Sequence, residues 1–262
     1  MLKRRLIPKL LMKASHRGPA ERTVLVTTVR FNEIIEVGDP VSQAKIYEAQ
    51  AADELIFIDL DATSQCRLTA VEVVRRAAEQ IFMPITVGGG VRSLQDFRTL
   101  LSNGADKVSV NTAAVESPDL IAQAASAYGA QCVVLSIDFR REPDGTCSVW
   151  THNGRVNTGL DAVAWAAEGE RLGAGEILLT AIDRDGTRRG LDLEATRAVT
   201  QRVSIPVITG GGCGLAKHFI EGFLVGGAEA VSAGTYFCFK DENPMQLRSQ
   251  IKNAGIPIRL HH

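Results

Sequence analysis

The chain has 262 residues, of which 45% are hydrophobic and 23% charged, so it can bury a sizeable core in one large or two small domains. This composition excludes a disordered, collagen-like or fibrous protein. The 29 Lys and Arg residues nearly balance the 30 Asp and Glu residues, which leaves a net charge of -1. No overall positive field attracts nucleic acid or anionic lipid, so we expect neither as a partner, and an anionic ligand must be bound by local groups.

Cysteine and histidine are too scattered to predict a cross-linked or metal-binding protein. The five cysteines show no C-x-x-C spacing, and the five histidines form no ligand pattern. The basic segment 1–13 has only a short apolar run, interrupted by Lys9 and Lys13, which is too short for a secretion signal or a spanning helix. We therefore predict a cytoplasmic protein with no metal and no cofactor.

Short apolar runs rich in β-branched residues alternate with amphipathic stretches, the pattern of successive βα units. The helical stretches include residues 40–52, 94–102 and 160–172. The predicted strands begin near Leu6, Leu55, Ile85, Lys107, Cys132, Glu176, Ile205 and Ala230. This order favours an α/β fold, a (β/α)8 TIM barrel, over a doubly wound sheet, because no G-x-G-x-x-G turn opens the first helix. Without a Pro- or Ser-rich linker, residues 1–262 are expected to form a single barrel domain.

Two segments interrupt the βα rhythm. Residues 13–38 follow the first strand, and residues 139–159 follow the fifth. The second segment contains the turn pairs Asp144-Gly145 and Asn153-Gly154 on either side of residues 148–151, which predicts a β-hairpin. Both segments should lie at the mouth of the barrel.

The two halves of the chain resemble each other. VGGGVRS at Val87 is followed 122 residues later by TGGGCGL at Thr209, and the stretch from Gly104 to Thr112 maps 123 residues on, to Gly227 and Thr235. A period of half the chain is too long for a solenoid, so it indicates two duplicated half-barrels.

Each half carries a glycine-rich turn after its third strand and a small polar turn after its fourth. Glycine lets backbone N–H groups approach an anion closely, and the start of a helix adds partial positive charge. Two such devices at one mouth suit a substrate with a phosphate at each end. The residues that we assign to these devices are Gly89, Gly90, Asn111, Thr112, Gly211, Gly212 and Thr235.

Several strings in the chain are characteristic of one enzyme family. They are RLIP at Arg5, VGDP at Val37, DELIFIDLDA at Asp53, ITVGGGVRS at Ile85, GADKVSVNTAAV at Gly104, SIDFRR at Ser136, GAGEILLTAIDRDGT at Gly173 and VITGGG at Val207. Over nearly its whole length the chain resembles the cyclase (synthase) subunit of imidazole glycerol phosphate synthase. The resemblance implies a lyase-type subunit of a glutamine amidotransferase heterodimer. A glutaminase subunit at the N-terminal face of the barrel would send ammonia through the core to a bis-phosphorylated ribulosyl substrate.

The family uses two aspartates, at the ends of strands 1 and 5, as general acid and base. Asp138 matches the strand-5 aspartate, whereas Leu11 stands at the strand-1 position and cannot exchange a proton. Thr27 stands where the family has a loop lysine. Losing a positioned acid or base typically costs about 10²–10⁴-fold in rate, so ordinary cyclisation should be impaired. Other polar positions that match the family are Asp59, Asp61, Thr180, Asp183 and Asp185.

The resemblance also assigns four charged residues to a ring that gates ammonia at the base of the barrel. They are Arg5, Glu54, Lys107 and Glu176. Each lies at the start of a strand, so inward side chains would meet at the N-terminal face. Two cations and two anions can satisfy one another there. A purely structural ion-pair plug is the alternative to a gate.

Three functions remain open from the sequence. The first is a cyclase-type synthase subunit in histidine biosynthesis. The second is an ammonia conduit and glutaminase activator that serves a separate sugar amidotransferase, as in second-copy synthase pairs associated with surface-polysaccharide genes, and Leu11 favours this branch. The third is a half-barrel sugar isomerase, which Leu11 weakens because that chemistry also needs two acidic groups.

Overall fold

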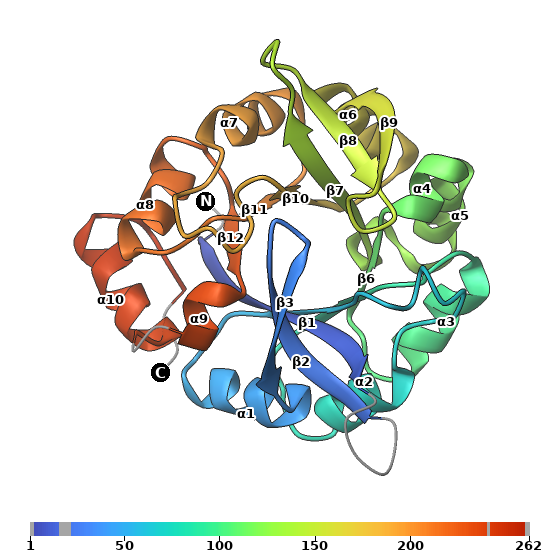
Figure 1. Cartoon of the computed structure of the whole chain (residues 1–262), viewed down its shortest axis with the longest axis horizontal. Helices are drawn as coiled ribbons and strands as arrows, with labels where there is room; N and C mark the ends of the chain where they lie inside the picture. The colour runs from blue at the N-terminus through green and yellow to red at the C-terminus, as the bar shows by residue number, and fades with distance from the viewer. Residues whose placement is uncertain (1–2, 16–21, 240–241, 260–262) are drawn as a thin grey trace.

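The computed structural model describes residues 3–15, 22–239 and 242–259. Eight parallel strands follow one another around a closed barrel, in the order β10-β11-β12-β1-β4-β5-β6-β7, and β7 closes the circle by pairing with β10 (Figure 1). These strands are β1 (Arg5–Ser15), β4 (Leu55–Asp59), β5 (Ile85–Gly88), β6 (Lys107–Val110), β7 (Val133–Arg141), β10 (Glu176–Ala181), β11 (Val207–Gly210) and β12 (Ala230–Ala233). The predicted TIM barrel is confirmed.

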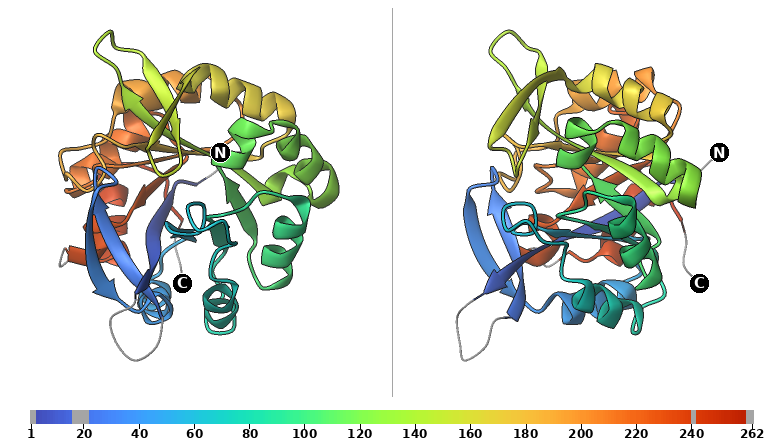
Figure 2. Two further views of the ribbon diagram at one scale, coloured as in Figure 1. Left: turned by 45° about the vertical axis from the view of Figure 1, so that its right-hand side comes forward. Right: turned by 90° about the vertical axis from the view of Figure 1, so that its right-hand side faces the viewer.

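Helices surround the barrel (Figures 1 and 2). They are α1 (Pro40–Ala49), α2 (Val71–Ala78), α3 (Leu94–Ser102), α4 (Thr112–Glu116), α5 (Asp119–Tyr128), α6 (Ala162–Leu172), α7 (Leu193–Arg202), α8 (Ala216–Leu224), α9 (Thr235–Phe239) and α10 (Pro244–Asn253), with a 3-10 turn, η1 (Ala130–Cys132). Across the described ranges, none of these helices has the length and apolar character needed to cross a membrane.

Local chemistry accounts for small shifts from the predicted boundaries. Helix α6 begins after Asp161, whose carboxylate accepts hydrogen bonds from the N–H groups of Val163 and Ala164 and so caps the helix. Strand β11 begins two residues later than predicted, directly after Pro206, which has no N–H to donate to a sheet.

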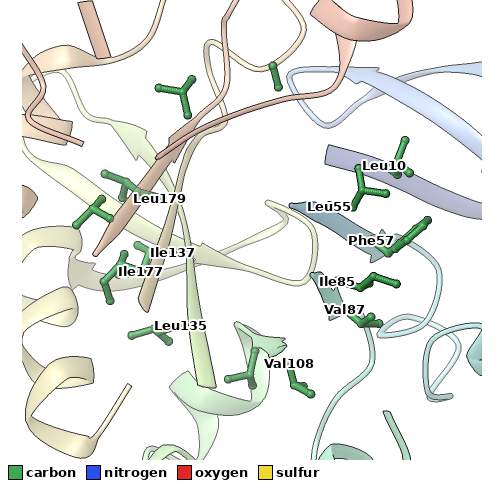
Figure 3. Close-up of a cluster of buried hydrophobic side chains, with 14 of the residues drawn as sticks. Leu10, Leu55, Phe57, Ile85, Val87, Val108, Leu135, Ile137, Ile177 and Leu179 are labelled. Carbon is green, nitrogen blue, oxygen red and sulfur yellow. The ribbon is translucent and has the colours of Figure 1, made fainter. Parts of the chain in front are cut away.

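Apolar side chains fill two separate layers. One layer lies inside the barrel and consists of Ile7, Ile56, Val134, Leu178, Ile208 and Ala230, each 0–1% exposed. The larger layer lies between the strands and the helices, and Figure 3 shows part of it. Because successive side chains of a strand point to opposite faces, Leu6 and Leu10 of β1 pack in the outer layer, while Arg5, Ile7 and Lys9 point inward.

Two β-hairpins stand at the carboxyl ends of the barrel strands, which we call the mouth (Figure 2). The predicted hairpin is confirmed: β7 continues into β8 (Cys147–Thr151) and β9 (Val156–Asp161). The other, β2 (Arg22–Val29) and β3 (Glu33–Gly38), was not predicted. It pairs antiparallel with the end of β1, where Leu11 lies opposite Val26.

Candidate functional site

Two adjoining cavities occupy the mouth. The larger has a volume of about 220 Å³ and contains the first glycine turn, residues 88–90, together with Asn111 and Thr112. The other, of about 110 Å³, lies towards β1 and the β2–β3 hairpin. Asp138 and Ser136 of β7 line both cavities. A group bound in either cavity therefore lies beside the Asp138 carboxylate.

Asp138 is held by Asn111, whose Nδ2 donates to its Oδ2 at 2.8 Å and also to the carbonyl of Trp150 at 3.3 Å. Loss of hydration raises the pKa of Asp138 to about 6, against the lowering effects of Lys9 and of the Asn111 hydrogen bond. The Asp185 carboxylate adds a smaller raising effect. A carboxyl with a pKa near neutrality can both accept and return a proton, which is the capacity expected of a general acid or base.

The first glycine turn approaches the loop after β4 too closely for any side chain. Gly89 has a φ of +107°, and a Cβ there would lie 2.5 Å from the Asp59 carbonyl oxygen. Asp59 is only 2% exposed. Its carboxylate accepts hydrogen bonds from Arg67, at 2.6 Å, and from the backbone N–H groups of Asp61 and Ala62. Asp59 thus organises the wall of the larger cavity.

The second glycine turn, residues 210–212, lines a much smaller cavity of about 10 Å³, which has room for about one water molecule. Its other lining residues include Lys9, Asp185 and Thr235. The predicted residues of the second half therefore line one cavity, but the two glycine turns differ in the space beside them.

The β1 side of the mouth is apolar where the family has its second aspartate. Leu11 is 7% exposed and packs with Val24 and Val26 of the hairpin, and against Ile58 and Leu60. Leu11 also lines the 110 Å³ cavity. The departure at Leu11 is thus part of an apolar contact between barrel and hairpin.

The hairpin reaches the mouth through Thr28 and not through Thr27, the position expected to replace the loop lysine. Thr28 Oγ1 donates to Asp185 Oδ2 at 2.7 Å, and Arg30 N–H donates to the Asp185 carbonyl at 2.8 Å. Lys9 lies on the other side of the same carboxylate, with its Nζ 3.9 Å from Asp185 Oδ1. Sequence reasoning missed Lys9. Because side chains alternate between the two faces of a strand and Arg5 points inward, Lys9 of the same strand could have been expected to point inward too.

Three further predicted residues differ in their distance from the mouth. Thr180 is 1% exposed, pairs in register with Asp138 and lines the 110 Å³ cavity. Asp61 lines the same cavity, and its carboxylate accepts the Ala14 N–H. Asp183 is exposed and accepts the Arg141 N–H, so it lies outside the cavities described above.

The four charged residues of the predicted ring meet at the N-terminal face. Arg5 contacts Glu54 at 2.9 Å and Glu176 at 2.5 Å, and Lys107 contacts the same two carboxylates at 3.0 and 2.8 Å. Burial opposes the charge on Arg5, but the two carboxylates outweigh it and raise the pKa of Arg5. Burial likewise opposes the charge on Glu54, and the two cations lower its pKa. We call this alternating circuit the charged ring.

The charged ring and the mouth lie at opposite ends of the same barrel. The ring forms the floor of an open cavity of about 330 Å³ on the N-terminal face. The apolar layer inside the barrel separates it from the mouth. One chain thus combines a shielded circuit of charge at its base with a titratable carboxyl at its top.

Comparison with known proteins identifies the family. The model of the family described as "Histidine biosynthesis protein" matches residues 19–242. The chain belongs to this family. It is also 50% identical, over 262 residues and 99% of both chains, to a protein of Prochlorococcus marinus (strain MIT 9313) named "Putative imidazole glycerol phosphate synthase subunit hisF2". The resemblance to the cyclase subunit, and to a second-copy paralogue of it, is confirmed.

Proposed function

We propose that the chain is the synthase-type subunit of a glutamine amidotransferase complex and receives ammonia from a glutaminase subunit at its N-terminal face. The observation that carries this proposal is the charged ring, in which each carboxylate is shared by both cations. A circuit buried at the end of a barrel costs desolvation that an apolar plug would avoid. Its presence beneath an open cavity of about 330 Å³ is explained if it controls what enters the barrel.

The mouth would bind a small molecule that carries a phosphate at each end. Two glycine turns support this assignment, because their positive-φ residues line the two cavities at places where a Cβ would collide with the backbone of a neighbouring loop. Asp138 would lie between the two phosphates and exchange a proton with the substrate. The roles of the individual mouth residues form part of this proposal.

A second function is favoured by the apolar cluster around Leu11. With no acid at this position, the barrel would deliver ammonia and activate the glutaminase while a separate sugar amidotransferase performs the synthesis. The two functions differ in one property, which is turnover of the cyclase substrate by this chain alone.

The first experiment measures ammonia-dependent turnover of the bis-phosphorylated ribulosyl imidazole precursor. The protein is compared with an authentic cyclase subunit and with Asp138→Asn. If the chain is a cyclase, the unmodified protein turns the substrate over and the variant loses about 10²-fold or more. If the chain only conducts ammonia, the unmodified protein gives no product while the authentic subunit is active.

The second experiment separates a gate from a structural plug. Glu54→Gln removes one charge from the ring with little change in shape, and Glu79→Gln removes an exposed charge from the end of α2 as a control. With a glutaminase subunit of this enzyme type, a gating ring predicts that Glu54→Gln releases more ammonia per product formed. A structural plug predicts that Glu54→Gln and Glu79→Gln release the same amount of ammonia per product formed.

A further inference from the structure

Lys9 is a buried cation at the centre of the mouth. Its side chain is 6% exposed and lines both the 110 Å³ cavity and the small cavity of the second glycine turn. Its charge acts on Asp138 on one side and on Cys213, which follows the second glycine turn, on the other. Lys9 therefore links the candidate proton-transfer group to the second candidate phosphate site.

The Lys9 ammonium has donor capacity that the protein does not use. Within the described ranges it makes no hydrogen bond, and the carboxylate paired with it, Asp185, stays 3.9 Å away. The nearer hydrogen-bond partners of Asp185 are the Thr28 hydroxyl, at 2.7 Å, and the N–H of Arg30. Because an ammonium has three donors and Lys9 lines both cavities, its unused donors are available to an acceptor bound there.

We propose that Lys9 is the anion-binding residue of the second glycine turn and that it selects a ligand with a phosphomonoester at this position. The phosphate would replace the Asp185 carboxylate as the partner of Lys9, while the backbone N–H groups at Gly211 and Gly212 contact its remaining oxygens. This inference rests on the proposed phosphate binding of the mouth and adds the group that supplies the charge.

Space and charge both support an exchange of partners. The cavity beside the second glycine turn holds about 10 Å³, far less than a phosphate needs. Asp185 lines it, and the Thr28 hydrogen bond ties the Asp185 carboxylate to the hairpin. A dianionic phosphate beside Lys9 repels the Asp185 carboxylate and weakens that bond. Binding at this site therefore weakens one contact between the β2–β3 hairpin and the β10–α7 loop, while the hydrogen bond from the Arg30 N–H to the Asp185 carbonyl remains.

The test uses inorganic phosphate and the amide signals of the two glycine turns. The full chain is titrated at constant ionic strength, and two-dimensional ¹H–¹⁵N NMR follows Gly211 and Gly212 separately from Gly89 and Gly90. Lys9→Met is the test variant. Lys13→Met is the matched control, because Lys13 lies on the same strand, is 3.8 Å from Asp61 and does not line the second-turn cavity. Lys9→Arg keeps the charge.

The unmodified protein should show a saturating response at Gly211 and Gly212. Lys9→Met should weaken phosphate binding there by about tenfold or more and leave the response at Gly89 and Gly90 within about twofold. Lys13→Met and Lys9→Arg should bind like the unmodified protein. The variant spectra report folding in the same measurement.

Two outcomes overturn the inference in distinguishable ways. If the unmodified protein binds phosphate at the second glycine turn and Lys9→Met binds equally well, Lys9 is not the anion-binding residue, although the proposed phosphate sites stand. If neither glycine turn of the unmodified protein responds to phosphate, the inference and the proposed phosphate binding fail together.

Discussion

Replacing Asp138 by asparagine should stabilise the protein more at alkaline than at acidic pH. In the folded protein the pKa of this carboxyl is raised from 3.8 to about 6, chiefly by burial. Between these two values the folded protein keeps a proton that the unfolded chain has lost, so stability falls as the pH rises through this window. An asparagine cannot ionise, and its carbonyl still accepts the hydrogen bond from Asn111.

The size of the effect follows from the two pKa values. Ionising Asp138 costs the folded state about 3 kcal/mol relative to the unfolded state at pH 8, and about 1 kcal/mol at pH 4.5. The gain from Asp138→Asn should therefore be about 2 kcal/mol larger at pH 8. Taking the difference between two pH values cancels effects of the substitution that do not depend on ionisation.

Urea unfolding of the unmodified and variant proteins at both pH values measures this difference. Asp183→Asn, at an exposed carboxyl of the β10–α7 loop, is the control for removing a negative charge at the surface. A ¹³C NMR titration of the Asp138 carboxyl provides a direct check of its pKa. An equal effect of Asp138→Asn at both pH values, with a titration midpoint near 4, would show that burial does not govern this carboxyl.

Two further pairs of variants test the charged ring and the second glycine turn by chemical denaturation. Lys107→Met leaves the two buried carboxylates with Arg5 and the more distant, exposed Arg259, and should cost about 3 kcal/mol or more. Lys217→Met, at an exposed pair on α8, should cost less than about 0.5 kcal/mol. If Lys107→Met and Lys217→Met lose the same unfolding free energy, the charged ring is not shielded from water. Gly211→Ala brings a Cβ within 2.5 Å of a backbone oxygen at a φ of +86°, so it should cost clearly more than the roughly 1 kcal/mol of Gly145→Ala, where φ is +89° and the space is open. If Gly211→Ala and Gly145→Ala cost the same unfolding free energy, the backbone around Gly211 moves to accommodate the added Cβ.

The sequence was sufficient for the barrel because its strands are apolar runs that alternate with amphipathic helical stretches. Starts were correct to within two residues, with the largest shift at Pro206. The charged ring was expected from the family resemblance, and its four members lie at, or directly before, the first residues of their strands. Local pattern and a repeated unit predict the barrel, whereas the resemblance predicts the ring.

The sequence was not sufficient for the β2–β3 hairpin or for the contacts that it makes. Strand β3 is largely exposed, so it lacks the alternation that identifies a half-buried strand. The hydrogen bond between Thr28 and Asp185 joins residues 157 positions apart. Lys9 looked like an interruption of an apolar run, because a buried lysine is explained only by the carboxylates that the closed barrel brings to it.

Restoring an acid at position 11 should carry a structural cost, because Leu11 serves the hairpin as well as the mouth. Leu11→Asp would put a carboxylate against Val24 and Val26. Lys9 and Lys13 line the same cavity, but the lost apolar packing and the desolvation of the charge should still destabilise the protein by about 2 kcal/mol or more at pH 8. Leu215→Asp, at a position that is 52% exposed, should cost less than about 1 kcal/mol. Urea unfolding compares the two. If both variants lose the same unfolding free energy, the hairpin accommodates the charge, and the missing acid affects only the mouth. If Leu11→Asp loses more, the loss of the acid and the packing of the hairpin on Leu11 are one structural change.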